Sequence, residues 1–176
     1  MRAPGAILLV SCYELGHQPF QLAMLLALLR QAGYVPVAVD TAVEELTSEA
    51  IAQAHFVAIS VPMHTALRLA EPIARSVRQL NPSAHINFYG LYAWLNADYL
   101  FDEGLADSVI AGEFEQPLIS LARSLEADSR PADGVEARRR SATAAISTPR
   151  PWSAIAASRP RSDVVATTAR RPGATA

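Results

Sequence analysis

The sequence contains no lysine, and all 15 of its basic residues are arginine. Cys12 is the only cysteine, so the chain cannot form an internal disulfide. One cysteine also cannot build a zinc or iron–sulfur site by itself, because such sites need three or four ligands. No apolar run approaches the ~20 residues that span a membrane. The run Ala6–Val10 is too short for a signal-peptide core, and we expect a cytoplasmic protein.

The charges are distributed unevenly along the chain. Residues 1–125 carry 6 arginines and 12 acidic residues, whereas residues 126–176 carry 9 arginines and 5 acidic residues. The second segment is rich in Ala, Arg, Ser, Thr and Pro and poor in large apolar residues, which predicts a disordered tail. Out-of-frame translation after a normal domain is an alternative explanation of this composition. The run Arg138–Arg140 is short and lacks interleaved aromatic residues, so we do not expect nucleic-acid binding.

Apolar runs alternate with segments of helical spacing along residues 5–125. The runs are typical of strands buried on both faces and lie at residues 6–10, 35–39, 55–61, 85–89 and 108–111. The predicted helices cover residues 19–33, 47–54, 65–80, 93–103 and 116–125. The third helix is expected to bury one apolar face, formed by Leu69, Ile73, Val77 and Leu80.

Strand and helix alternate five times in this segment, and parallel strands need crossover connections of this kind. The order therefore predicts an α/β domain over residues 1–125, with a flavodoxin-like (Rossmann-like) five-stranded parallel sheet of strand order 2-1-3-4-5. The disordered tail is predicted to follow over residues 126–176. Ligands of such open sheets bind in the loops at the carboxyl ends of the strands.

Two glycines stand where predicted strands end. Gly90 and Gly112 would permit a positive φ and let a ligand approach the backbone closely. Either glycine alone is explained equally well by ordinary turn chemistry. Because they end neighbouring strands, together they favour a shared cleft.

The sequence of these loops resembles the cobalamin-binding domain found at the N-terminus of many radical S-adenosylmethionine enzymes. The turn Gly-Glu-Phe-Glu at residues 112–115 resembles that family's Gly-Glu-Gly-Glu turn, with Phe114 in place of the second glycine. Tyr89 and Gly90 resemble the small-residue strand end that lies under the cobalamin nucleotide tail, and Ser60 stands where the family commonly has Ser or Thr. Residues 13–20 and 62–65 are most similar to a subgroup whose full-length members end in a short cysteine-containing tail.

The resemblance covers about 120 residues and implies a cobalamin-binding module. The cofactor-binding residues that it implies lie in the four loops and are Tyr13, Glu14, Leu15, Gly16, Ser60, Pro62, Met63, His64, Tyr89, Gly90, Leu91, Gly112, Glu113, Phe114 and Glu115. No catalytic residue and no protein ligand to the cobalt are implied. The expected partner is cobalamin, with no membrane partner. Because the catalytic barrel is missing, the resemblance implies a module, a fragment, or half of a two-chain system whose partner is a radical S-adenosylmethionine catalytic chain.

Two family features are absent from this sequence. The motif Asp-x-His-x-x-Gly, whose histidine binds cobalt in many cobalamin proteins, is replaced by a loop with Ser11 at the Asp position and Tyr13 at the His position. The Cys-x-x-x-Cys-x-x-Cys run that holds the radical iron–sulfur cluster cannot exist with one cysteine. We interpret His17 and His64 as solvated loop residues and Cys12 as a small buried hydrophobe.

Several other functions of this fold are disfavoured. A phosphate-accepting receiver domain would need an aspartate after the third strand, where Ser60 and Val61 stand. It would also need a lysine after the fifth strand, and the sequence has no lysine. The loop at residues 12–18 is too poor in Ser, Thr and Gly for a flavin phosphate site, and it lacks the Gly-x-Gly-x-x-Gly of dinucleotide folds. No nucleophile elbow supports a hydrolase that uses Ser60 with His64. The open alternative is a non-catalytic α/β domain that docks a protein and binds no cofactor.

Overall fold

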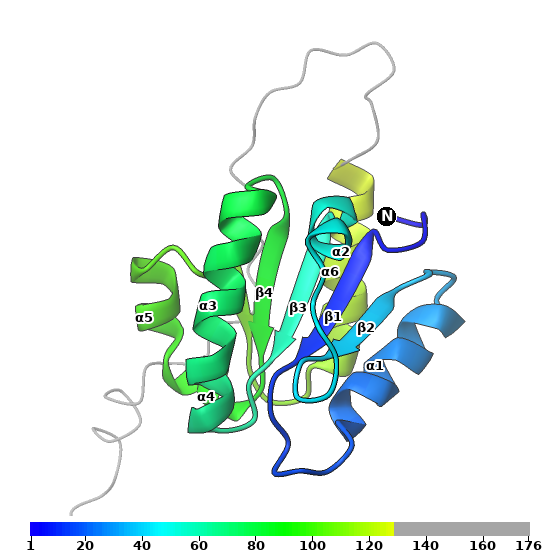
Figure 1. Ribbon diagram of the computed structural model, residues 1–176. Coiled ribbons are helices and arrows are strands. Elements are labelled where there is room, and N and C mark those ends of the chain that lie inside the picture. Colours follow the sequence, from blue (N-terminus) through cyan, green and yellow to red (C-terminus); the bar gives the residue numbers. More distant parts are fainter. Residues whose placement is uncertain (129–176) are drawn as a thin grey trace, which may run out of the picture. The chain divides into compact units, whose positions relative to one another are not determined.

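Five strands form one all-parallel sheet in the order β2-β1-β3-β4-β5, which confirms the predicted flavodoxin-like α/β fold (Figure 1). The structure is a computed structural model and describes residues 1–128. The tail predicted from its composition lies outside the described residues, apart from residues 126–128, which continue the last helix. The strands are β1 (Ile7–Ser11), β2 (Val37–Asp40), β3 (Phe56–Ser60), β4 (His85–Tyr89) and β5 (Ser108–Ile110).

Helices cover both faces of the sheet, as crossover connections require. They are α1 (Phe20–Gln31), α2 (Ser48–Gln53), α3 (His64–Leu80), α4 (Leu91–Leu95), α5 (Ala97–Asp102) and α6 (Glu115–Asp128). Helices α1 and α6 pack on one face, and α2, α3, α4 and α5 supply buried residues to the other (Figure 1). Within residues 1–128, none of the helices combines the length and the apolar character needed to cross a membrane.

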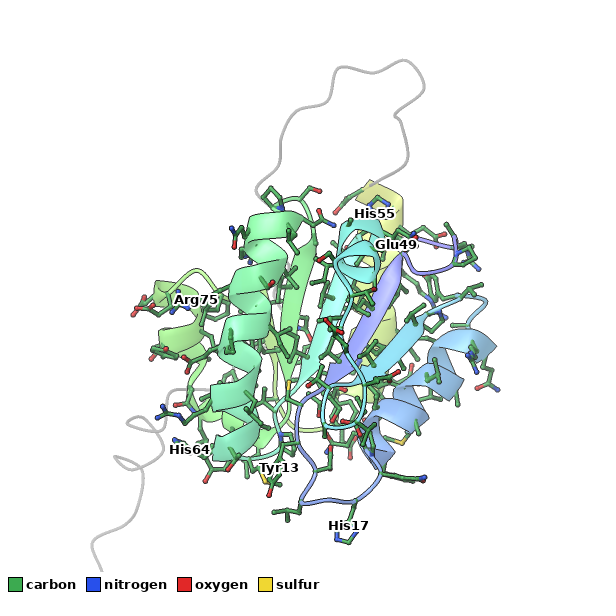
Figure 2. The ribbon with its side chains drawn as sticks, viewed as in Figure 1. Tyr13, His17, Glu49, His55, His64 and Arg75 are labelled. Carbon is green, nitrogen blue, oxygen red and sulfur yellow. The ribbon has the colours of Figure 1, made fainter. Side chains whose placement is uncertain are left out.

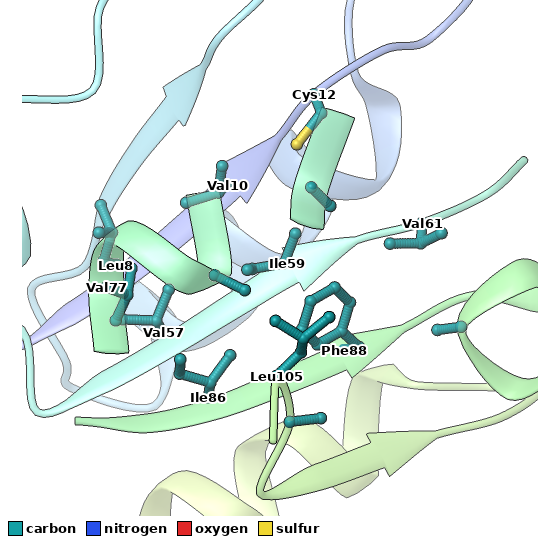
Figure 3. Close-up of a cluster of buried hydrophobic side chains, with 14 of the residues drawn as sticks. Leu8, Val10, Cys12, Val57, Ile59, Val61, Val77, Ile86, Phe88 and Leu105 are labelled. Carbon is teal, nitrogen blue, oxygen red and sulfur yellow. The ribbon is translucent and has the colours of Figure 1, made fainter. Parts of the chain in front are cut away.

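The core between the sheet and α3 consists of aliphatic side chains from alternate strand positions, with Phe88 among them (Figure 3). Cys12 belongs to this cluster and is 2% exposed, which confirms its interpretation as a buried hydrophobe. The strand residues Leu8, Val10, Val57 and Ile59 are completely buried. Because both faces of the sheet are covered, the central strands read as continuous apolar runs in the sequence.

The predicted buried face of α3 is only half right. Val77 is completely buried and Ile73 packs against the core, but Leu69 and Leu80 are 45% and 47% exposed, and the rest of the buried face includes Ala66, Ala70 and Ala74. These alanines recur at a spacing of four residues and form a smooth stripe that lets the helix lie close to the sheet. Small side chains give a weak apolar signal, so the larger leucines dominated the pattern in the sequence.

The segment predicted as one helix over residues 93–103 is two short helices that meet at Asn96. The Asn96 side-chain Nδ2 donates a hydrogen bond to the carbonyl of Tyr92 at 2.7 Å, and its backbone leaves helical geometry. Asparagine side chains compete with the backbone for such hydrogen bonds, which explains the break.

Contacts between distant segments tie α6 to the start of the chain. Arg2 forms an ion pair with Glu126 at 2.8 Å, and the hydroxyl of Tyr34 donates to the same carboxylate at 3.2 Å. The guanidinium of Arg2 also lies 4.9 Å from the centre of the Tyr34 ring. Because these interactions fix Glu126 within the folded domain, α6 continues beyond the predicted domain boundary at Leu125.

We expect Leu29→Ala to lower the free energy of unfolding by about 2–5 kcal/mol, because Leu29 is fully buried between α1 and the sheet. The matched variant Leu69→Ala, also within a helix, should cost less than about 1 kcal/mol because its side chain is largely exposed. Urea denaturation followed by circular dichroism measures both. Equal losses would contradict the burial described for α1 and α3.

Candidate functional site

The carboxyl ends of four neighbouring strands form a row of polar residues. Strand pairing places Asp40 beside Ser11, Ser11 beside Ser60, and Ser60 beside Tyr89. Each of these residues is the last of its strand. We call this edge of the sheet, with the loops that follow the strands, the carboxyl rim. Figure 2 shows Tyr13, His17 and His64 at this end of the domain and His55 at the other.

Three hydroxyls of the row lie on the α1/α6 side of the sheet. Tyr89 belongs to the core cluster on that side, and strand alternation places Ser11 and Ser60 there too. The Ser60 Oγ donates a hydrogen bond to Oε1 of Gln21, in the first turn of α1, at 3.2 Å. Residues 1–128 supply no hydrogen-bond partner for Ser11 Oγ or the Tyr89 hydroxyl, although Ser11 is 1% exposed and Tyr89 is fully buried.

Unpaired buried hydroxyls are costly, at about 1–3 kcal/mol each. Burial raises the pKa of Tyr89 far above its usual value; the nearby Ser60 hydroxyl opposes this rise, and the charge of Glu14 adds to it. Within residues 1–128 the Tyr89 hydroxyl makes no hydrogen bond. The two unpaired hydroxyls, at the ends of β1 and β4 on either side of Ser60, are the polar groups that a ligand could satisfy.

Glu14 contributes a third unpaired atom from the loop after β1. Within the described residues its Oε1 is buried without a partner. Burial raises the pKa of this carboxyl, and the nearby Asp40 raises it further. The loop turns tightly here: the His17 N–H donates to the Glu14 carbonyl at 2.9 Å, and Leu15 adopts a φ of +53°. A non-glycine residue in this region is strained, so the turn positions Glu14 at a conformational cost.

An aromatic pair closes the α1/α6 side of the rim. The rings of Tyr89 and Phe114 are 4.8 Å apart at 44°, and Phe114 is 6% exposed. The resemblance associates both positions with small residues, so the pair fills space that such residues would leave open. A ligand group that reaches the Tyr89 hydroxyl must therefore displace a side chain. Gly112, two residues before Phe114, has a φ of +65° and open space around its Cβ direction.

Gly90 has a packing role in the described chain. Its φ is +104°, and a Cβ at this position would lie 2.8 Å from the carbonyl oxygen of Val61. Glycine is therefore required for the close approach of the β3 and β4 ends, in addition to its backbone conformation. The cleft expected beside Gly90 is occupied by protein backbone at this point, whereas the surroundings of Gly112 are open.

The remaining predicted site residues lie on the α3 side or on the surface of the rim. Tyr13 and Met63 pack against the core cluster under α3. His64 is exposed, with its ring 6.4 Å from that of Tyr92. The other predicted residues form the outer surface: Leu15, Gly16, Leu91, Gly112 and Glu113 are exposed, and Pro62 and Glu115 are half-buried. The rim therefore presents two groups of residues, one on each side of the sheet.

No metal site is formed within the described residues. No group of three or more His, Cys, Asp or Glu side chains comes together among residues 1–128. His17 is exposed like His64, as expected for solvated loop histidines. His55 and His85 lie at the amino ends of β3 and β4, where His85 is 2.9 Å from the Ser108 hydroxyl. Burial lowers the pKa of His85, although Asp107 opposes the shift.

Three residues of the site were not predicted from the sequence: Asp40, which ends β2, Gln21 and Ser11. Gln21 reaches Ser60 across 39 positions of the chain, and Ser11 was noted only as the residue at the position of a missing motif aspartate. A polar residue that ends an otherwise apolar strand was the signal for Ser11. Gln21 carried no comparable signal, because a glutamine in a first helical turn is ordinary.

Two cavities lie at the opposite, amino end of the strands. The larger has a volume of about 340 Å³ and includes His55, His85, Arg78 and Asp107 in its lining. The smaller, of about 170 Å³, lies beside Gly5. Arg78 is fully engaged there, since it pairs with Asp107 at 2.8 Å and donates to the carbonyls of Ala84 and Gly104. These interactions are structural and leave the rim as the candidate site.

Comparisons with known proteins find the same fold elsewhere and assign no ligand. No protein-family model and no curated protein matches the chain. A solved structure of a pilus assembly-related protein from Burkholderia pseudomallei is similar, with 15% sequence identity and a TM-score of 0.52, over 76% of this chain and 98% of that chain. An adenylate cyclase from Rhodopirellula baltica has 14% identity and a TM-score of 0.46, over 70% and 86% of the two chains. The first likeness shows a shared fold alone.

We expect Gly90→Ala to lower the free energy of unfolding by about 3 kcal/mol or more, because it combines backbone strain with the contact to Val61. Gly104→Ala is the control: Gly104 also has a positive φ, of +65°, but has open space around its Cβ direction. It should cost only the strain, about 1–2 kcal/mol. Chemical denaturation measures both, and an equal cost would refute the packing role of Gly90.

Cys12 should be unreactive in the folded protein. Burial raises the pKa of its thiol to about 11. Because the thiolate is the nucleophile, alkylation by iodoacetamide at pH 8 should be at least about 100-fold slower than in the chain unfolded by guanidinium. Mass spectrometry of timed samples gives both rates. Fast labelling of the folded protein would show that the segment after β1 opens readily.

Proposed function

We propose that this domain binds cobalamin at its carboxyl rim, as a binding module without a catalytic centre of its own. The observation that carries the proposal is that three of the four buried side-chain atoms without a hydrogen-bond partner among residues 1–128 lie at the carboxyl rim, namely Ser11 Oγ, Glu14 Oε1 and the Tyr89 hydroxyl; the fourth, Asn87 Oδ1, lies in the middle of β4. Buried polar groups are nearly always paired in proteins, so a cluster of exceptions indicates a ligand site.

The position of these atoms agrees with the general rule for parallel α/β sheets, whose ligands bind at the carboxyl ends of the strands. The loop resemblance is the reason for proposing cobalamin as the ligand. The unpaired atoms are an acceptor and two hydroxyls that both donate and accept, so they suit a ligand with hydrogen-bonding groups of both kinds. Access to the Tyr89 hydroxyl on the α1/α6 side requires Phe114 to move, because the two rings are packed 4.8 Å apart.

The residues have separate tasks in this proposal. The hydroxyls of Ser11, Ser60 and Tyr89 would form hydrogen bonds with polar groups of the cofactor from the α1/α6 side of the sheet. Tyr13 and Met63 would contact the cofactor from the α3 side. Cobalamin, when bound, supplies cobalt chemistry, which the protein can orient but does not itself perform. With one buried cysteine, these 176 residues hold no radical iron–sulfur cluster, so the proposal assigns any radical S-adenosylmethionine chemistry to a catalytic domain outside them.

A docking domain without a cofactor is the second candidate, and the exposed apolar residues of the rim favour it. Four large apolar residues at the rim are between 61% and 82% exposed: Leu15 and Phe20 after β1, Val43 after β2 and Leu91 after β4. Exposed apolar groups gathered at one end of a domain mark an interaction surface. Such a surface could cover a bound cofactor or contact a protein directly, so cofactor binding decides between the two functions.

The full chain, mixed with hydroxocobalamin, should retain the cofactor on gel filtration and shift its visible spectrum, with a Kd of about 50 μM or tighter. Absence of retention at that concentration would reject the cobalamin proposal and leave the docking domain. Methylcobalamin provides a second measurement with a different upper ligand. Binding should also raise the melting temperature, because a ligand that binds only the folded state stabilises it.

Tyr89→Phe separates a ligand-binding hydroxyl from a structural one. We expect unchanged or increased stability, because the variant removes an unpaired buried hydroxyl, together with about five- to tenfold weaker cobalamin binding. Tyr34→Phe is the matched control: its hydroxyl donates to Glu126 at the other end of the domain. This control should lose about 1 kcal/mol of stability and keep its affinity. Unchanged cobalamin affinity in Tyr89→Phe would remove this hydroxyl from the site.

A further inference from the structure

The loops of the carboxyl rim carry negative charge only. The segments after the strands, residues 12–19, 41–47, 61–63, 90 and 111–114, contain four glutamates and no arginine, and the chain has no lysine. Asp40 adds a further carboxylate at the end of β2. A charged rim by itself does not define a ligand, but it does determine which charges a ligand may carry.

The unpaired atoms supply an independent indication of the ligand's chemistry. Glu14 offers an oxygen that accepts, while the hydroxyls of Ser11 and Tyr89 can donate or accept. A primary amide has both a donor and an acceptor and is complementary to this set. A carboxylate has acceptors only, and it would meet the oxygen of Glu14 with the wrong charge.

The N-termini of helices at the same rim favour negatively charged ligands, whereas the carboxylates of the loops disfavour them. Helices α1 and α3 begin there without an acidic residue in the first turn, and such ends favour anions. In α6 the first turn already contains Glu115. No arginine in the rim loops reinforces these partial charges, and each is smaller than the full charge of a nearby carboxylate.

We infer that the rim binds an uncharged, amide-bearing side of its ligand and discriminates against carboxylate-bearing analogues, with Glu14 as the residue that sets this preference. The inference rests on the proposed function and specifies it further. The corrin ring of cobalamin bears primary amides at its edge, so the proposed cofactor has the required chemistry. Glu14 acts on specificity through its contact with the ligand and takes part in no reaction step.

Two tail-free corrinoids test this preference directly. Dicyanocobinamide carries amides on its corrin side chains and is uncharged, whereas dicyanocobyrinic acid carries carboxylates on the same ring. Spectroscopic titration of the full chain at about 0.15 M salt limits the influence of distant charges, because the Debye length there is about 8 Å. We expect the amide form to bind at least about tenfold more tightly.

Glu14→Gln keeps the size of the side chain and removes its charge, so it should narrow that ratio by at least about threefold. Glu45→Gln makes the same change of net charge at an exposed position after β2 and should leave the ratio within about twofold of the original. The ratio is insensitive to partial unfolding, which would lower both affinities equally.

The outcomes are distinguishable. Binding of neither corrinoid nor cobalamin would overturn both the proposed function and this inference. Binding of cobalamin with no preference between the two analogues would overturn the inference and leave the proposed function standing. An unchanged ratio in Glu14→Gln, or an equal narrowing in Glu45→Gln, would likewise overturn the assignment to Glu14.

Discussion

Parallel pairing in register is the constraint on which the candidate site depends. Because Ser11, Ser60 and Tyr89 occupy equivalent positions at the ends of adjacent strands, their side chains project to the same side of the sheet at the same height. A shift of one residue in any of these strands would turn its polar side chain to the other face. The apolar residues that precede them are buried on both faces and hold the register.

The two ends of the sheet treat polar groups differently. At the amino end, Arg78 forms an ion pair with Asp107, and Asp107 also accepts a hydrogen bond from the Ile86 N–H. His85 contacts the hydroxyl of Ser108, and these interactions stabilise that end of the fold. At the carboxyl rim, three buried polar atoms have no partner within residues 1–128 and lie near a strained turn, whereas farther from the rim only Asn87 Oδ1 is buried without one. Natural domains accept unpaired atoms and strained backbones mainly at functional sites, which supports the carboxyl rim as the proposed site.

The aromatic pair of Tyr89 and Phe114 connects the stability of the domain to its proposed function. In the described chain the rings fill the end of the α1/α6 core and exclude water from the Tyr89 hydroxyl. A ligand group that uses this hydroxyl has to replace the contacts of Phe114 with contacts of its own. Any affinity measured for the rim is therefore the difference between new ligand contacts and the aromatic packing that is lost.

The sequence by itself determined the class of fold, the strand order and most element positions, because these follow from local apolar periodicity and crossover rules. It also indicated which end of the sheet would carry a site. Tertiary structure alone decided that alanines form part of the buried face of α3, that Gly90 is needed against Val61, and that Gln21 meets Ser60. Each of these depends on distances between segments remote in the chain, and no local pattern of residues contains such distances.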